Sequence, residues 1–164
     1  MVQGVPILSG FVVGRHPTAE AAESHRASEP FRLMPRYMLD ADTVSYAIRG
    51  EGQVAPRLLE HQPSELCISS ITLAELKFGA EAKRSQKLHR ALRSFVKDVA
   101  VIPFDESAAE RFALVATALA RRGEPIGAFD SLMAAHALSL GLTVVTNNTK
   151  HFNRVPGLTV QNWV

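Results

Sequence analysis

The sequence predicts an α/β protein with three layers, in which helices cover both faces of a mainly parallel central sheet. Two observations support this fold class. From about residue 34 onward, short apolar segments alternate with longer segments of helical pattern. The apolar segments are also continuous rather than alternately apolar and polar, which is typical of strands that are buried on both faces.

The strands are predicted from short runs of apolar residues. The second run, around Cys67, is rich in Leu and Ile and partly β-branched, which favours a buried strand over a helix. The single cysteine excludes an intrachain disulfide and suits a reducing cytoplasm. In chain order, we expect strands at residues 36–40, 66–71, 99–104, 142–146 and 158–163.

The helices are predicted from their periodicity and from their start and stop signals. Asp105 is a typical N-cap, Gly123 and Pro125 are typical stop signals, and Gly141 ends the last helix. The longest helical segment is expected to break once, near Ser85. In chain order, we expect helices over residues 43–49, 54–61, 72–96, 106–122 and 128–140.

Residues 1–33 differ from the rest because they lack a clear helix or strand period. We therefore expect a poorly ordered N-terminal extension over 1–33, of the kind that an over-long start-codon assignment would add, and a folded domain over 34–164. No segment approaches the roughly 20 apolar residues that a membrane span needs, so no membrane association is expected.

Three acidic residues carry the main functional prediction. Asp40 closes the first strand, Glu75 follows the second strand, and Asp130 opens the helix that leads into the fourth strand. In a parallel sheet, ligands bind beyond the carboxyl ends of the strands. Carboxylates gathered there bind a hard divalent cation and support phosphodiester hydrolysis.

Each acid also has a structural alternative. Glu75 completes a Ser/Thr-x-x-Glu capping box with Thr72, and the helix dipole alone favours Asp130 in a first turn. A carboxylate that closes an apolar strand, such as Asp40, has no local structural task, so a functional role is favoured. Asp42 is expected to cap the helix that starts at Thr43.

The histidine and cysteine residues do not indicate a metal site. His136 is expected to be a packed or surface histidine rather than a metal ligand, and no Cys/His spacing indicates zinc.

The basic residues are concentrated in one segment. The chain has a net charge of +2 and a pI of about 8.9, which is compatible with a nucleic-acid partner. Residues 83–97 contain six Lys or Arg residues and no acid, and the spacing of Lys83, Lys87 and Arg90 predicts one shared helix face. The alternatives are phosphate binding and a solvated surface.

From residue 34 to its end, the chain resembles PIN-domain ribonucleases of the VapC toxin type, the nuclease half of bacterial toxin–antitoxin pairs. Four motifs in the same order carry the resemblance, and a tail around Val155-Pro156-Gly157-Leu158 and Asn162-Trp163 adds to it. The motifs cover residues 38–46, 69–79, 125–137 and 145–152.

This resemblance implies RNA cleavage that depends on Mg²⁺ or Mn²⁺. By position, Asp40 and Asp130 are the expected metal ligands, and Glu75 is the third acid, which holds metal or orients water. The resemblance also implies a homodimer, a cognate VapB-type antitoxin that covers the acidic cleft, and tRNA as a possible substrate. Many PIN domains have an aspartate near Asn148. The amide adds no charge there, which leaves one-metal and two-metal chemistry open.

Two competing functions follow from the same residues. Asp40-Ala41-Asp42-Thr43-Val44 fits the DxDx[T/V] motif of haloacid-dehalogenase-like phosphatases, although Asp130 lacks the second acid which that family needs. Asn148 also leaves open a catalytically impaired PIN-like module that binds RNA or a partner without cutting it.

Overall fold

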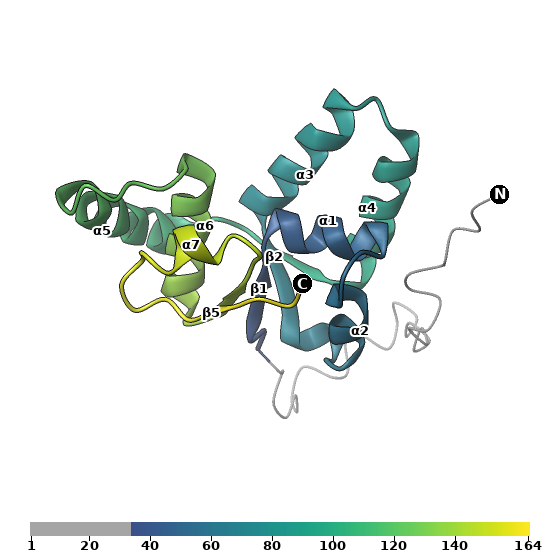
Figure 1. Cartoon of the computed structure of the whole chain (residues 1–164), viewed down its shortest axis with the longest axis horizontal. Coiled ribbons are helices and arrows are strands. Elements are labelled where there is room, and N and C mark those ends of the chain that lie inside the picture. Colours follow the sequence, from purple (N-terminus) through teal and green to yellow (C-terminus); the bar gives the residue numbers. More distant parts are fainter. Residues whose placement is uncertain (1–33) are drawn as a thin grey trace, which may run out of the picture.

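Five parallel strands form one sheet at the centre of the computed structural model, which describes residues 34–164 (Figure 1). The predicted N-terminal extension, residues 1–33, lies outside the described residues. The first elements are β1 (Tyr37–Leu39), α1 (Ala41–Arg49), α2 (Val54–Leu59), the 3-10 helix η2 (Pro63–Glu65), β2 (Leu66–Ser69) and α3 (Ser70–Ala82). They are followed by α4 (Gln86–Asp98), β3 (Ala100–Ile102), α5 (Glu106–Arg121), α6 (Ala128–Leu140), β4 (Thr143–Val145), α7 (Thr149–Phe152) and β5 (Val160–Gln161).

The strand order is β3-β2-β1-β4-β5, and every neighbouring pair is parallel. The chain moves outward from β1 through β2 to β3 and then crosses back to the other side of β1. The order therefore reverses between β1 and β4, where Leu39 is paired with Val145. In open α/β sheets, ligands bind outside the carboxyl ends of the strands at such a reversal. The predicted parallel sheet is confirmed.

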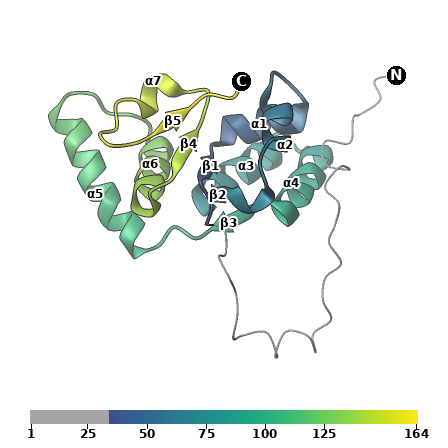
Figure 2. The same cartoon turned by 90° about the horizontal axis from the view of Figure 1, so that it is seen from below.

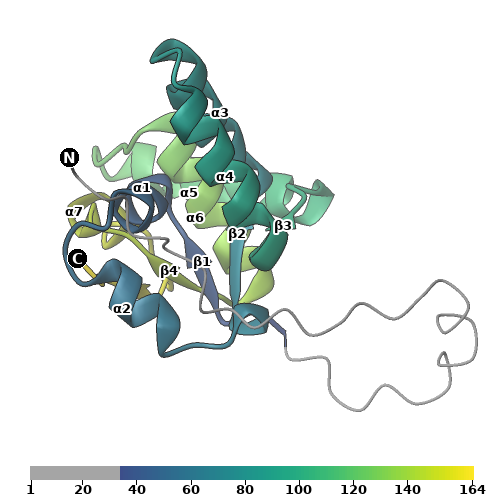
Figure 3. The same cartoon turned by 90° about the vertical axis from the view of Figure 1, so that its right-hand side faces the viewer.

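Two apolar cores lie on opposite faces of the sheet, because successive strand residues point to opposite sides. Met38 and Val144 belong to the core with α5, α6 and α7, whereas Leu39 and Val145 belong to the core with α1, α2, α3 and α4. Figure 1 shows these two helical layers on either side of the strands, and in Figure 3 the layer with α3 and α4 faces the viewer. The predicted three-layer arrangement is confirmed.

The helix boundaries agree with most of the local signals. Helices α5 and α6 pack along each other (Figure 2), and α5 has the predicted N-cap, with Asp105 Oδ1 accepting from the Ala108 N–H at 3.0 Å. Gly141 ends α6 in the left-handed conformation, with φ of 67°, which only glycine adopts readily. The short helices η2 and α7 were not predicted, because three or four residues carry no readable period.

The predicted break near Ser85 is confirmed. Helix α3 ends at Ala82, and Ser85 is the N-cap of α4, with its Oγ accepting from the Leu88 N–H at 3.3 Å. Because Lys83 follows the end of α3 and α4 begins at Gln86, Lys83 does not share a helix with Lys87. The predicted common face of Lys83, Lys87 and Arg90 is therefore wrong.

Within residues 34–164, no helix combines the length and the apolar character that crossing a lipid bilayer requires.

Candidate functional site

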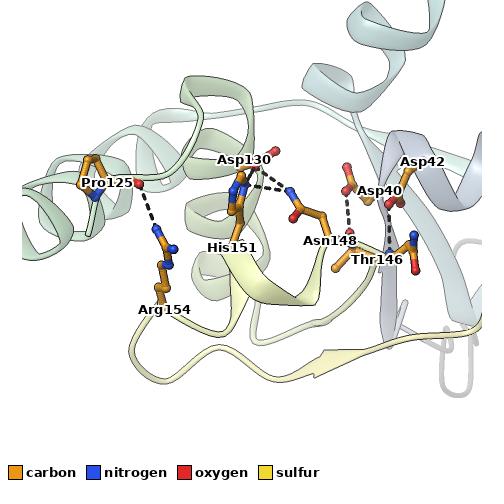
Figure 4. A network of polar contacts seen from close by, with 9 residues as sticks. Asp40, Asp42, Pro125, Asp130, Thr146, Asn148, His151 and Arg154 are labelled. Carbon is orange, nitrogen blue, oxygen red and sulfur yellow. Dashed lines mark hydrogen bonds and ion pairs between the residues drawn. The ribbon is translucent and has the colours of Figure 1, made fainter. Parts of the chain in front are cut away.

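Asp40 lies at the carboxyl end of β1, at the point where the strand order reverses. Its side chain is 7% exposed, its Oδ1 accepts from the Ala41 N–H at 2.7 Å, and its Oδ2 accepts from Thr146 Oγ1 at 2.8 Å (Figure 4). Asp40 is thus the N-cap of α1. The expectation that Asp40 has no local structural task is wrong, because α1 begins two residues earlier than predicted.

The pKa of Asp40 is raised from its usual 3.8 to about 7, and burial is the largest cause. The negative charge of Asp42 is the second cause of this rise, and that of Asp130 contributes in the same direction. The hydrogen bonds from Thr146 and from the Ala41 N–H lower it, but by less than burial and the like charges raise it. Without a compensating cation, the site therefore disfavours the ionised form of Asp40.

Asp42 joins the same acidic group instead of capping a helix. It lies in the first turn of α1, where its Oδ2 accepts from the Asn147 N–H at 3.0 Å and its Oδ1 lies 3.2 Å from Thr43 Oγ1. The prediction that Asp42 caps the helix is therefore wrong. It ties the start of α1 to the loop that follows β4.

Glu75 reaches the site from α3. This helix begins at Ser70 with Ser69 as its N-cap, so Glu75 lies in the second turn and the capping-box alternative with Thr72 is wrong. Partial burial raises the pKa of Glu75, and the charges of Asp130 and Asp42 raise it further. Asp42 on α1 and Asp130 on α6 are therefore both close enough to Glu75 on α3 to raise its pKa.

Asp130 lies in the first turn of α6, as predicted. Its Oδ2 accepts from Asn148 Nδ2 at 3.1 Å and lies 2.8 Å from His151 Nδ1 (Figure 4). Asn148 lies in the segment between β4 and α7, close to the end of β4. Its contact with Asp130 therefore places the start of α6 at the same rim of the sheet as Asp40. The three predicted acids are thus brought to one edge by three different elements.

Thr146 is a functional candidate that the sequence analysis missed. It is fully buried at the end of β4, where it donates to Asp40 and its Oγ1 accepts from the Asn148 N–H at 2.9 Å. His151, beside Asp130, was also missed as an individual residue. The only available signal for either was its position within the fourth motif, at the end of a predicted strand.

His136 is a packed residue, which confirms one of the two predicted alternatives. It is 1% exposed, and its Nδ1 lies 2.9 Å from the Oγ of Ser69. Burial lowers its pKa. The contact joins α6, which carries Asp130, to the N-cap of α3, which carries Glu75, so it helps to set the spacing of the two acids.

The acidic rim offers carboxylate oxygens as possible ligands for a metal ion. Among residues 34–164, no three Asp, Glu, His or Cys side chains are arranged so that they could hold a metal ion as they stand. Asp40 and Asp130 are instead engaged by hydrogen-bonding neighbours. The acidic rim nevertheless fits a hard cation, because burial and the charges of Asp42 and Asp130 raise the pKa of Asp40 and of Glu75, and a bound cation would offset both effects.

A groove of about 480 Å³ leads away from the acids between α1, α3 and α4. Asp42 and Glu75 line one part, Arg49 and Lys83 line another, and the remaining walls are mainly apolar. The groove therefore runs from the acidic rim to the basic residues Arg49 and Lys83.

Comparison with known families identifies the fold. A family model described as PIN domain matches residues 37–158. The chain belongs to the PIN-domain family. PIN-domain ribonucleases generally depend on divalent metal ions. The match confirms the resemblance indicated by the four motifs, and it replaces the phosphatase interpretation of Asp40 and Asp42.

Relatives of this PIN domain include curated ribonucleases. The tRNA(fMet)-specific endonuclease VapC of Salmonella typhimurium is 37% identical over 131 residues, which cover 79% of this chain and 99% of that relative. Ribonuclease VapC2 of Haemophilus influenzae is 34% identical over 132 residues, which cover 80% of this chain and all of that protein.

Solved structures with the same PIN fold include toxin–antitoxin complexes. DNA-bound VapBC from Salmonella typhimurium matches with a TM-score of 0.72 and 38% identity, covering 80% of this chain and 100% of the matched chain. VapBC2 from Rickettsia felis, bound to a DNA fragment from their promoter, matches with a TM-score of 0.72 and 34% identity, covering 78% and 98%.

Proposed function

We propose that this PIN domain is a metal-dependent endoribonuclease toxin that a cognate VapB-type antitoxin neutralises. The observation that carries the proposal is the acidic rim at the β1–β4 reversal, where Asp40, Asp42, Glu75 and Asp130 come together from α1, α3 and α6. The family match and the curated ribonucleases among the relatives support RNA as the substrate class. A cellular RNA substrate and the single buried thiol of Cys67 both support action in the cytoplasm.

The roles of the acids follow from where each is held. Asp40 and Asp130 would be the principal ligands of Mg²⁺ or Mn²⁺, and Glu75 would hold the ion or orient the attacking water. When bound, such an ion lowers the pKa of a coordinated water and neutralises charge on the phosphate. Thr146 fixes the direction of the Asp40 carboxylate through its 2.8 Å hydrogen bond.

The groove beside the acids is proposed to receive RNA and antitoxin at overlapping positions. Arg49 and Lys83 in its wall suit phosphate groups, whereas its apolar part and the exposed ring of Phe78 suit a protein segment. Matched relatives that are solved as VapBC complexes support an antitoxin partner. One relative is named a tRNA(fMet)-specific endonuclease, so tRNA is the first substrate to test. The homodimer implied by the family resemblance stays a prediction.

The test is an RNA cleavage assay in Mn²⁺, with and without EDTA. The wild-type protein should cut RNA, and both EDTA and Asp40→Asn should abolish cutting; Asn is chosen because it retains N-cap capacity. A tRNA and an unstructured RNA of equal length serve as parallel substrates, and added cognate antitoxin should inhibit cleavage. Cleavage that survives both EDTA and Asp40→Asn would refute the proposal. Tight RNA binding without cleavage would favour the impaired binding module instead.

A further inference from the structure

Three side chains meet beside the acidic rim, and the three contacts between them cannot all be hydrogen bonds at the same time. They belong to Asp130 in the first turn of α6, to Asn148 just before α7, and to His151 one turn later in α7 (Figure 4). Asn148 occupies the N-cap position of α7, but its side chain does not cap that helix. It is turned towards Asp130 instead.

The three contacts form a closed triangle. His151 Nδ1 lies 2.8 Å from Asp130 Oδ2 and 2.8 Å from Asn148 Nδ2, and Asn148 Nδ2 lies 3.1 Å from Asp130 Oδ2. A ring nitrogen offers a single position, either one N–H or one lone pair. If His151 Nδ1 carries a hydrogen and donates it to Asp130, this N–H also faces the amide N–H of Asn148. If Nδ1 instead offers its lone pair to Asn148, the same lone pair faces the negatively charged carboxylate of Asp130.

Turning the Asn148 amide over does not remove the conflict. The oxygen and nitrogen of an amide are assigned from their surroundings, so Oδ1 can take the place of Nδ2. One hydrogen on His151 Nδ1 would then have to serve two oxygens that stand 3.1 Å apart. In each arrangement at least one contact lacks a hydrogen of its own. Partly buried polar groups are seldom left in this state, so the arrangement favours a partner that all three atoms can share.

A metal ion would satisfy all three atoms at once. With the amide turned over, Asp130 Oδ2, Asn148 Oδ1 and His151 Nδ1 each present a lone pair. Neighbouring ligands of an octahedral ion at about 2.1 Å stand about 3.0 Å apart, and the three observed separations are 2.8, 2.8 and 3.1 Å. The side chains of Asp130 and His151 are 24% and 39% exposed, so positions remain open for water and substrate.

We propose that His151 is a metal ligand, acting through Nδ1 together with Asp130 and Asn148, and that its imidazole shifts the preference of this site from Mg²⁺ towards Mn²⁺. The inference deepens the proposed function, on which it rests for the requirement for a divalent ion. Mg²⁺ favours oxygen ligands, whereas transition-metal ions gain more from an imidazole nitrogen.

The direct test is pulsed electron paramagnetic resonance of the full-length protein loaded with one equivalent of Mn²⁺. The wild-type protein should show nitrogen-14 modulation from a coordinated imidazole, and His151→Gln should lose it. His89→Gln on α4 is the matched control and should keep the modulation. A wild-type spectrum without nitrogen coupling, or coupling that persists in His151→Gln, would overturn the assignment.

Calorimetry tests the metal preference separately. The ratio of the Mg²⁺ dissociation constant to the Mn²⁺ dissociation constant should fall about tenfold in His151→Asp, because the imidazole is replaced by a carboxylate. An unchanged ratio would contradict the proposed role of the imidazole.

The two proposals fail in different ways. If the protein cleaves RNA in Mn²⁺ but shows no nitrogen coupling, the nuclease proposal stands and the assignment of His151 as a metal ligand fails. If the protein shows nitrogen coupling but does not cleave RNA, His151 is a metal ligand and the nuclease proposal fails.

Discussion

Thr146 Oγ1 donates to Asp40 Oδ2 at 2.8 Å and joins the ends of the neighbouring strands β1 and β4. Both side chains are buried, and the same hydroxyl oxygen accepts from the Asn148 N–H at 2.9 Å. One residue therefore orients the carboxylate at the centre of the acidic rim and also the backbone that leads to His151. A polar residue at the end of an apolar strand acts here as a positioning group.

Replacing Thr146 with Val should test this positioning role. Val has nearly the same shape but leaves the Asp40 carboxylate without its donor and the Asn148 N–H without its acceptor, which should cost about 1–3 kcal/mol of unfolding free energy. Loss of the donor should also raise the pKa of Asp40 further and weaken metal binding by about tenfold or more. Urea unfolding and Mn²⁺ titration measure these effects. Thr146→Ser, which keeps the hydroxyl, should restore most of the metal affinity, and failure to do so would contradict the role.

Asp40→Asn should stabilise the metal-free protein at high pH. Because the pKa of Asp40 is raised from 3.8 to about 7, the folded protein retains a proton there between about pH 4 and 7 that the unfolded chain has released. Folding stability attributable to Asp40 therefore falls as pH rises through this window, by at most about 4 kcal/mol. Asn removes the charge and can still cap α1.

The measurement is urea unfolding of wild type and Asp40→Asn in EDTA at pH 4.5 and pH 8. The variant should be the more stable protein at pH 8, and its advantage should shrink at pH 4.5. Other groups that titrate in this range, such as His136, are common to both proteins and cancel in the difference. An advantage that does not vary with pH would contradict the raised pKa of Asp40.

Glu75→Gln should abolish cleavage while leaving the fold intact. Glu75 does not cap α3, and its raised pKa reflects burial and the charges of Asp130 and Asp42, so neutralising it removes repulsion. The melting temperature without metal should stay the same or rise slightly. Glu81→Gln, in the exposed last turn of the same helix, is the matched control and should keep full activity. An active Glu75→Gln enzyme would remove Glu75 from the site.

Much of the fold was predictable because its signals are local. The strands were found from apolar runs, the break at Ser85 and the stop at Gly141 from residue types with strong backbone preferences, and the parallel sheet from alternation alone. The meeting of Asp40, Glu75 and Asp130 at one rim followed from the order of the elements, because parallel strands end at the same edge.

The remainder of the site depends on contacts between distant parts of the chain. Helix α1 starts at Ala41 rather than Thr43, and its first turn is held by contacts that span more than 100 positions: Thr43 Oγ1 donates to the Val145 carbonyl, and Asp42 accepts from the Asn147 N–H. The place of His151 depends on the four-residue helix α7, which is too short to show a period in the sequence.

The basic surface of α4 supports a last prediction about RNA binding. Lys87 and Arg90 are both exposed on α4, the helix whose Leu88 and Leu92 line the groove that leads to Asp42 and Glu75. If both contact phosphates, the double variant Lys87→Gln/Arg90→Gln should bind RNA more weakly, and the slope of log K against log salt should become shallower by about 1.4, at roughly 0.7 per contact on a single strand. Arg111→Gln/Arg121→Gln removes the same charge from α5, in the other helical layer, and should leave the slope unchanged. Filter binding at four salt concentrations distinguishes the two cases. Equal slopes for both double variants would mean that the charge of α4 acts only as a solvated surface, and that RNA reaches the acids by another path.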